Sequence, residues 1–251
     1  MSPATLREGV GVLTPDWPAP SGVRAAFTLR SGGVSTPPYD SLNVGVHVGD
    51  VPDCVAENRT RVREYLRLPG EPAWLEQVHG TDVVELDAGE PTMPADAVTT
   101  RRPGRVCAVQ VADCMPVLFT ARDASVVGVA HAGWRGLAAG VLEATVARLG
   151  VPPAELIAWL GPAISAQHFE VGAEVRAAFV ARDGGTADAF AANARGRWQC
   201  NLAALARRRL ATLGIAAVYG GEWCTYTDRE QFFSFRRDGQ CGRMAALIWL
   251  E

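Results

Sequence analysis

From about Trp74 to His131 the chain is a succession of short apolar runs, most of them rich in β-branched residues. Gly, Asp and Pro separate these runs, which read AWLEQVHG, VVELDA, RVCAVQVAD, MPVLFTA and SVVGVAH. Such runs are typical of the strands of one sheet system. Several connections are too short for a helical crossover, so at least some strands must pair antiparallel. We therefore expect an α+β fold with mixed or largely antiparallel β-sheets flanked by helices.

The flanking helices are predicted from the spacing of apolar residues. Asp50 and Pro52 are suited to the N-cap and first turn of a helix that runs to about Leu68. After the GWRG turn, apolar residues at helical spacing predict a helix from Leu137 to Leu149. The remaining expectations are helices over 173–181 and 201–213, a mobile surface loop over 182–198, and strands over 23–30, 155–160, 216–228, 231–237 and 243–250.

No break in composition marks an interior boundary, so residues 1–251 are expected to form one domain. Residues 1–21, rich in Pro and Gly, are expected to wrap its surface. The chain start does not resemble a signal peptide, and no apolar run approaches the ~20 residues that span a bilayer. Six cysteines without such a signal indicate reduced thiols in the cytoplasm. With a net charge of −3 and interspersed signs, neither nucleic acid nor an anionic membrane is an expected partner.

Three residues with metal-binding side chains lie next to predicted strands. His79 follows AWLEQV, Cys114 precedes Met115 of the run MPVLFTA, and His131 follows SVVGVA. Two imidazoles and a thiolate are a three-ligand zinc set, and a fourth position left open is typical of a catalytic site. Each residue alone is more often structural, however, and the spacing matches no compact zinc motif. His47 alternates with valines and is interpreted as a core residue or a support for such a site.

The GWRG turn predicts an anion site, because it combines a helix N-terminus with the guanidinium of Arg135 and the backbone of Gly136. The alternative is that Arg135 pairs with Asp113 while Trp134 packs in the core. Arg30, which ends its own predicted strand before Ser-Gly-Gly, is a second candidate for binding phosphate.

Several blocks of the sequence resemble, in order, those of the laccase-domain family. They are TLRSGGVSTPPYDSLNVGVHVGD, LEQVHGTDV, ADCMPVLF, VGVAHAGWRGL, GPAISAQHFEVG and FFSFRRDGQCGRMAALIWL. The resemblance extends from about Phe27 to Leu250. It implies a single α+β domain, similar to a toxin deamidase that uses Cys and His. It also implies that the ligand positions of the family fall on His79, Cys114 and His131. The chain departs from the family at Phe169, Phe235 and Cys241, which stand where Tyr, Tyr and Thr are usual.

Members of this family have been called multicopper polyphenol oxidases, purine nucleoside phosphorylases and peptidoglycan editing factors. A four-copper oxidase needs many histidines, whereas this chain has four and no His-x-His pair. A single copper with Met115 as axial ligand would resemble an electron-transfer centre instead. A third alternative is a metal-free hydrolase with Cys114 as nucleophile and His131 as base. A protein that only binds a ligand, or uses the metal to hold its fold, is a non-enzymatic alternative.

The resemblance therefore implies a zinc-dependent purine nucleoside phosphorylase that uses orthophosphate and also deaminates adenosine. Its substrates would be adenosine, inosine, guanosine and methylthioadenosine. Zinc lowers the pKa of bound water toward ~7, which suits the deamination. Glu76 and Asp113 are candidates for the general acid or base only because they lie close in the sequence to His79 and Cys114. The runner-up is hydrolysis of the amide that joins L-serine to UDP-N-acetylmuramic acid.

Overall fold

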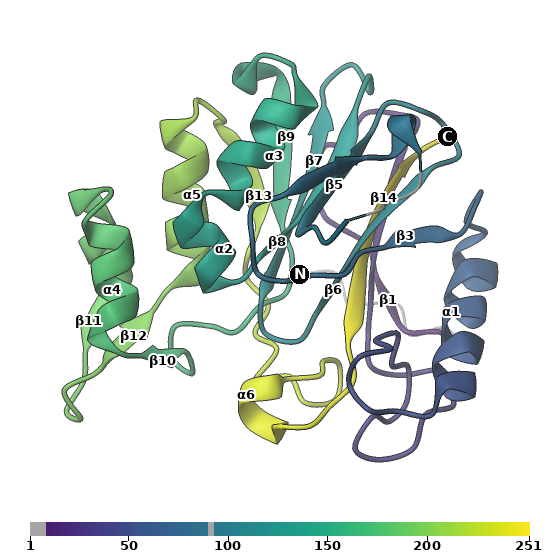
Figure 1. The fold of residues 1–251 in the computed structure, drawn as a ribbon, viewed down its shortest axis with the longest axis horizontal. Helices are drawn as coiled ribbons and strands as arrows, with labels where there is room; N and C mark the ends of the chain where they lie inside the picture. The colour runs from purple at the N-terminus through teal and green to yellow at the C-terminus, as the bar shows by residue number, and fades with distance from the viewer. Residues whose placement is uncertain (1–8, 90–92) are drawn as a thin grey trace.

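Two β-sheets stack face to face between two layers of helices, as the ribbon in Figure 1 shows. The computed structural model describes residues 9–89 and 93–251. The five-stranded sheet has the order β1 (Val12–Leu13), β2 (Val23–Thr28), β14 (Met244–Leu250), β6 (Val106–Val111) and β3 (Pro72–Trp74). The six-stranded sheet has the order β13 (Ala217–Gly220), β9 (Leu156–Leu160), β7 (Met115–Ala121), β8 (Val127–Ala132), β5 (Ala97–Thr100) and β4 (Val83–Glu85).

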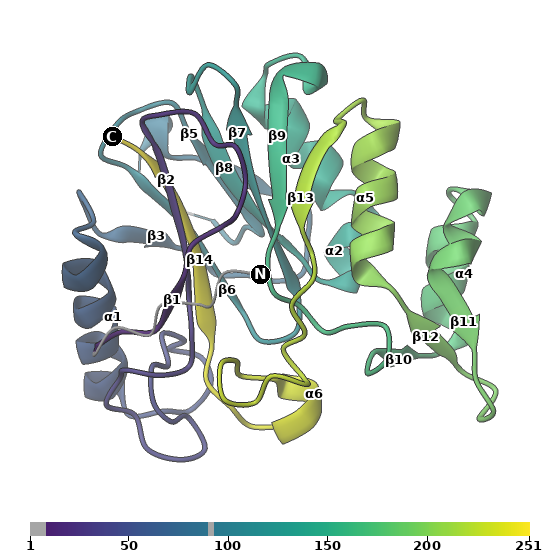
Figure 2. The ribbon, with the colours of Figure 1, turned by 180° about the vertical axis from the view of Figure 1, so that it is seen from behind.

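Both sheets are mixed, and most of their strand pairs are antiparallel. The parallel pairs are β3 with β6, β4 with β5 and β13 with β9. The helix α1 (Pro52–Leu66) covers the outer face of the five-stranded sheet, and α2 (Trp134–Ala139), α3 (Val141–Leu149) and α5 (Leu202–Thr212) cover that of the six-stranded sheet (Figures 1 and 2). This architecture confirms the expected α+β class with mixed sheets flanked by helices.

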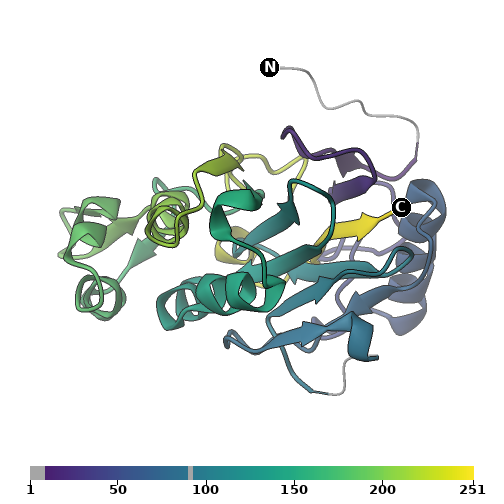
Figure 3. The ribbon, with the colours of Figure 1, turned by 90° about the horizontal axis from the view of Figure 1, so that it is seen from above.

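A smaller unit lies at the edge, with α4 and α1 at opposite ends of the molecule (Figure 3). It combines α4 (Ala173–Val180) with a three-stranded sheet of β10 (Glu170–Val171), β12 (Trp198–Cys200) and β11 (Phe190–Ala192). The short helices are η1 (Leu86–Ala88), η2 (Pro153–Glu155), η3 (Gly184–Ala189) and α6 (Phe235–Asp238). No helix in residues 9–89 and 93–251 has both the length and the apolar character needed to cross a bilayer.

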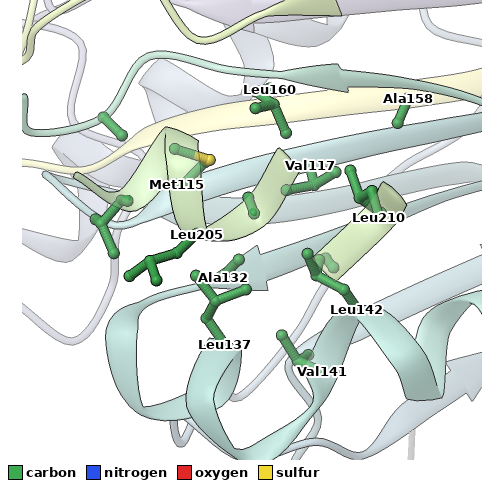
Figure 4. Packing of buried hydrophobic residues seen from close by; sticks show 14 of the residues in the cluster. Met115, Val117, Ala132, Leu137, Val141, Leu142, Ala158, Leu160, Leu205 and Leu210 are labelled. Atoms are coloured by element: carbon green, nitrogen blue, oxygen red, sulfur yellow. The ribbon is translucent and has the colours of Figure 1, made fainter. Parts of the chain in front are cut away.

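The central strands are apolar on both faces because each face meets a different layer. In β14, Met244, Ala246 and Ile248 point into the layer between the sheets. Ala245 and Leu247, which alternate with them, pack toward α1. Strand side chains alternate between the two faces, so a strand between two layers becomes a continuous apolar run. The same alternation sends alternate residues of β7 and β8 to α2, α3 and α5, where Figure 4 shows them.

Several expected elements differ from the structure. The expected loop over 182–198 contains η3 and β11, because Asp183 caps η3 through Gly185 N and the next residues pair with β12. The expected strand over 231–237 is a turn that leads into α6, whose first turn is capped by Ser234. The expected helix over 137–149 is two helices that meet at Gly140, whose φ of 115° interrupts the helical path. The expected strand of AWLEQVHG ends at Trp74.

The N-terminal prediction can be compared only from residue 9, since residues 1–8 lie outside the described part. The segment 9–21 contains the edge strand β1, which pairs antiparallel with β2. Val10 is buried in the cluster beneath α1, so this segment contributes to the core.

Candidate metal centre

His131 lies near the end of β8, where the six-stranded sheet meets the turn into α2. Its neighbours Ala130 and Ala132 face the helices, so alternation directs the His131 side chain toward the five-stranded sheet. The residue opposite His131 in β7 is Pro116, which has no N–H to donate. The side chain is only 4% exposed, and an imidazole buried to this degree requires polar partners.

Cys114 occupies the tight turn that joins β6 to β7. The preceding residue, Asp113, has a φ of 89°, which an L-residue adopts only when its surroundings hold it there. Its buried carboxylate accepts hydrogen bonds from Thr225 Oγ1 at 2.6 Å and from Arg236 N at 2.6 Å. Asp113 therefore fixes the turn that presents the Cys114 thiol, which is half-buried against the layer between the sheets.

His79 lies in a loop after β3 and not at a strand end, and its φ is 61°. One carboxylate holds this loop in place. Asp96, which is fully buried, accepts hydrogen bonds from the backbone N–H groups of Val78 at 3.1 Å, His79 at 2.9 Å and Gly80 at 2.6 Å. His131 Nδ1 donates to Asp96 Oδ1 at 2.8 Å as well. A single buried side chain therefore positions both histidines.

The ligand atoms of His79, Cys114 and His131 lie within 4.8 Å of one another, although 35 and 17 residues separate them along the chain. His79 Nε2 is 3.9 Å from Cys114 Sγ, and the two imidazole rings meet edge to face with centroids 4.8 Å apart. Ligands on one tetrahedral zinc lie about 3.6 Å apart for the usual bond lengths. Because Nδ1 of His131 donates to Asp96, its Nε2 is the nitrogen left to bind a metal. The three residues therefore fit a metal ion.

Charges within the group stabilise a thiolate beside an imidazolium. Burial raises the pKa of Cys114, but the charge of His131 and the hydrogen bonds from both histidines outweigh it and lower the pKa to about 6. Burial lowers the pKa of His131, whereas the Cys114 charge and the Asp96 hydrogen bond raise it to about 9. Burial likewise opposes the charged form of Asp96, yet the His131 hydrogen bond and the backbone N–H groups lower its pKa. A thiolate is the form of cysteine that binds metals.

Gly133 leaves the space in which the three side chains meet. A Cβ atom at this position would lie 2.8 Å from Cys114 Sγ and 3.1 Å from His79 Cδ2. The φ of Gly133 is −63°, which any residue adopts, so only the close approach of these side chains requires glycine.

We therefore expect Gly133→Ala to lower zinc occupancy while the fold persists, because the methyl group displaces two ligands but leaves the backbone relaxed. The measurement is metal content of the purified variant together with its far-UV circular dichroism. Gly184→Ala is the control, since a Cβ there meets nothing within 4 Å. Full zinc occupancy in Gly133→Ala would show that the ligands do not converge as described.

The two cations predicted to bind phosphate have different surroundings. All three guanidinium nitrogens of Arg30 bond within the protein: Nε and Nη2 to Asp40, and Nη1 to Arg229 O. Arg135 is exposed, with its guanidinium 4.6 Å from the ring centroid of Trp134. Arg135 does not pair with Asp113, whose carboxylate is bonded elsewhere. Trp134 packs against the helix-side core, as expected.

The other candidates are placed as follows. Gly136 is buried, and a Cβ there would lie 3.0 Å from the Gly80 carbonyl oxygen, so its small size allows α2 to approach the His79 loop. Glu76 is exposed, and its backbone carbonyl accepts a hydrogen bond from Ala95 N. Asp113 is occupied in holding the Cys114 turn. His47 is exposed at the surface, which corrects the expectation of a core residue.

Asp96 is the residue that sequence reasoning missed. It stands directly before AVTT, the run that forms β5, and all four residues of that strand are buried. An acidic residue next to a fully buried strand needs several hydrogen-bond donors nearby, and this position in the sequence could therefore have indicated its role. Its four donors come from segments 16 to 35 residues away.

Comparison with known proteins identifies relatives along almost the whole chain. A purine nucleoside phosphorylase of Pseudomonas aeruginosa is 54% identical over 240 residues, which are 95% of this chain and 98% of that protein. The purine nucleoside phosphorylase YfiH of Escherichia coli is 53% identical over 241 residues, with 95% and 98% coverage. Among solved structures, a Neisseria meningitidis protein superimposes with a TM-score of 0.92 at 49% identity and covers 96% of this chain and 99% of its own.

The profile of one protein family matches residues 24–251, and this family is described as multi-copper polyphenol oxidoreductase laccase. A YfiH protein of Bacillus licheniformis has the same fold, with a TM-score of 0.85 at 32% identity and coverage of 91% and 93%. The match includes all three residues of the candidate metal centre. The chain is therefore a member of the multi-copper polyphenol oxidoreductase laccase family and, from its relatives, an enzyme.

Proposed function

We propose that this protein is a zinc-dependent purine nucleoside phosphorylase of the cytoplasm that also deaminates adenosine. Its substrates are orthophosphate and a purine nucleoside: adenosine, inosine, guanosine or methylthioadenosine. Relatives about half identical over nearly their whole length carry the name purine nucleoside phosphorylase. The observation that carries the metal dependence is the convergence of His79, Cys114 and His131 around the space left by Gly133.

Zinc suits this donor set better than copper. Two imidazoles and one thiolate are three protein ligands, the number typical of catalytic zinc. A blue-copper centre has a weak axial ligand as well, for which Met115 is the candidate by adjacency. Met115 is only 1% exposed and packs among the helix-side residues of Figure 4, whereas His131 faces the five-stranded sheet. The thioether thus lies on the opposite face of the six-stranded sheet from the imidazole.

The hydrogen bonds of each residue indicate its role at the site. A bound zinc supplies Lewis acidity at the coordination position that the protein leaves open. Asp96 keeps the proton of His131 on Nδ1 and holds the His79 loop, so both imidazoles are oriented before any ligand arrives. The Asp113 carboxylate already accepts two hydrogen bonds from the protein and orients the Cys114 turn. The exposed Glu76 is therefore the better of the two candidates for proton transfer.

We expect zinc-loaded protein to release hypoxanthine from inosine only when phosphate is present. Removal of the metal with a chelator should lower this rate by more than about 100-fold, since supporting residues alone already account for losses of 10–100-fold. Addition of zinc should restore it. Hypoxanthine is measured in a coupled assay, and zinc by elemental analysis of the same samples.

Two results would contradict the proposal. One is the absence of base release with phosphate, together with release of serine from UDP-N-acetylmuramoyl-L-serine, which would identify the amide hydrolase instead. The other is full phosphorolytic activity in protein that contains no metal.

A metal-free thiol hydrolase is the second candidate, because Cys114, His131 and Asp96 lie in the order of a nucleophile, a base and the group that orients the base. The two mechanisms make opposite predictions for chelated protein. Cys114→Ala should abolish activity under either mechanism. Wild-type protein without metal should stay fully active only if it is a thiol hydrolase.

A further inference from the structure

Two arginines that lie far apart in the sequence flank the segment 43–47. Val44 N donates to Arg243 O at 3.1 Å, and Arg59 Nε donates to Val44 O at 3.0 Å. The fully buried Asn43 holds the segment further, because its Oδ1 accepts from Gly45 N at 2.9 Å and Arg243 N at 2.8 Å. The backbone of this segment therefore fixes where both arginines emerge.

The two guanidinium groups are held in place by aromatic rings and by the chain itself. That of Arg59 lies 4.1 Å from the ring centroid of Trp74. The side chain of Arg243 runs along Gly45, where a Cβ atom would lie 2.7 Å from its Cγ. Arg243 Nη1 donates to the carbonyl oxygen of Cys241 at 2.9 Å, and its guanidinium is 5.8 Å from the ring centroid of Phe235. Both positive charges are therefore oriented in advance.

Neither arginine forms an ion pair within 4.0 Å in the part of the chain that the structure describes. Glu71 is the acid whose charge reaches Arg59, but its carboxylate is bonded to Trp74 Nε1 and pairs with Arg63. Both arginines are only half-exposed. Two positive charges that are partly shielded from water, bond the same segment and lack a carboxylate partner favour binding of an anion.

His47 lies in the segment that the two arginines flank. Its pKa is lowered by partial burial of the ring and then by the positive charges of Arg243, Arg59 and His131. The charges of both arginines and of His131 therefore reach the same imidazole. Phe235, which is 58% exposed, adds apolar surface beside Arg243, and the exposed Val78 adds apolar surface next to His79 in the chain. A cationic pair with an exposed aromatic ring beside Arg243 suits a ligand with one anionic and one flat apolar part.

We infer that Arg59 and Arg243 form the subsite that binds the orthophosphate of the proposed phosphorolysis, in place of Arg30 and the GWRG turn. This inference rests on the proposed function. Arginine matches the geometry of phosphate oxygens, and within the described residues the Nη2 groups of Arg59 and Arg243 form no hydrogen bond that would compete for them. The diphosphate of a uridine diphosphate sugar has the same oxygen chemistry and is the other source of such an anion.

The test compares Arg59→Gln and Arg243→Gln with Arg61→Gln in the zinc-loaded enzyme. Arg61 lies on the same helix as Arg59, but its Nε pairs with Glu57 at 2.7 Å. Calorimetric titration with inorganic phosphate should give a Kd raised about 10- to 100-fold in the first two variants, the effect of losing a charge-assisted hydrogen bond. The KM for phosphate should rise by the same factor while the KM for inosine stays within about threefold, as expected for a loss confined to one ligand. Arg61→Gln should match wild type.

Arg59→Gln loses the contact with Trp74 and could fail to fold for that reason. Variants that keep the positive charge test the subsite in that event. Arg59→Lys and Arg243→Lys should bind phosphate with an intermediate Kd, because lysine retains the charge but not the paired donors. Melting temperatures identify any variant that is unfolded. A titration with a uridine diphosphate sugar forms the second arm and distinguishes the two sources of the anion.

The outcomes separate this inference from the proposed function. If wild type shows phosphorolysis but both glutamine variants keep the wild-type Kd and KM for phosphate, or only Arg135→Gln raises them, the subsite is wrong and the function stands. If the glutamine variants lose phosphate binding but wild type releases no base, the subsite stands and the function is wrong. If only the uridine diphosphate sugar binds at the two arginines, both are overturned.

Discussion

Asp96→Ala is expected to lower the free energy of unfolding by about 3–5 kcal/mol, the usual result of removing one partner from a buried charged group. Its carboxylate satisfies four donors, so the alanine variant leaves three part-buried backbone N–H groups and the buried His131 imidazole without this acceptor. Chemical denaturation monitored by circular dichroism measures the change. We expect the metal-free protein to show the loss, since the hydrogen bonds do not require zinc.

Asp96→Asn separates the structural role from the role in metal binding. The amide keeps one acceptor oxygen, but its NH₂ group faces donors that the carboxylate accepts. Zinc affinity should fall about 10- to 100-fold, as for other groups that orient a histidine ligand. Asp87→Asn is the matched control, because Asp87 accepts hydrogen bonds from Thr100 Oγ1 and Arg101 N at the other end of β5. Unchanged zinc affinity in Asp96→Asn would show that Asp96 supports only the fold.

The contribution of Asp96 depends on pH in a defined direction. Its pKa in the folded protein is below the ordinary value, so the stabilisation is fully present above about pH 4, where the unfolded chain is also ionised. It is lost as pH falls through the folded-state pKa. The difference in unfolding free energy between wild type and Asp96→Asn should therefore shrink below about pH 4.

Cys114→Ser is expected to lose more than about 100-fold in both zinc affinity and phosphorolysis, because a hydroxyl does not supply the thiolate that binds the metal. The substitution also removes the thiolate that pairs with the His131 imidazolium, so the metal-free variant should melt below metal-free wild type. Elemental analysis, the coupled base-release assay and thermal denaturation measure the three quantities.

Cys54→Ser is the control for this experiment, since Cys54 is a half-buried thiol on α1, outside the metal centre. It should bind zinc and release hypoxanthine as wild type does. A Cys114→Ser variant that retains one zinc and normal activity would remove Cys114 from the ligand set. A variant that retains zinc but loses activity would favour Cys114 as a nucleophile.

The strands that form the centre of the fold were predictable from the sequence. β6, β7, β8 and β14 are buried on both faces, so each is a continuous run of apolar residues that is visible without a structure. The small strands β11 and β12 were missed, because they are short and partly exposed and pair only within the peripheral unit. Their pattern does not differ from that of a surface loop.

The candidate site was predictable only in part. The ordered sequence blocks indicated His79, Cys114 and His131, and the structure brings their ligand atoms together. It also shows the surroundings of two other candidates. Met115 stands next to Cys114 yet points to the other face of the sheet, and Arg30 is bonded to Asp40 and Arg229.

The sequence by itself determined the α+β class, the buried strands and the identity of three candidate ligands, because periodicity and residue chemistry are local properties. Only the tertiary structure decided that Asp96 holds two loops, that Gly133 leaves the space between the ligands, and that Arg59 and Arg243 flank one segment. These relations join residues 15 to 200 positions apart. They arise from how two sheets and their loops pack, and no local pattern encodes which distant donor meets which acceptor.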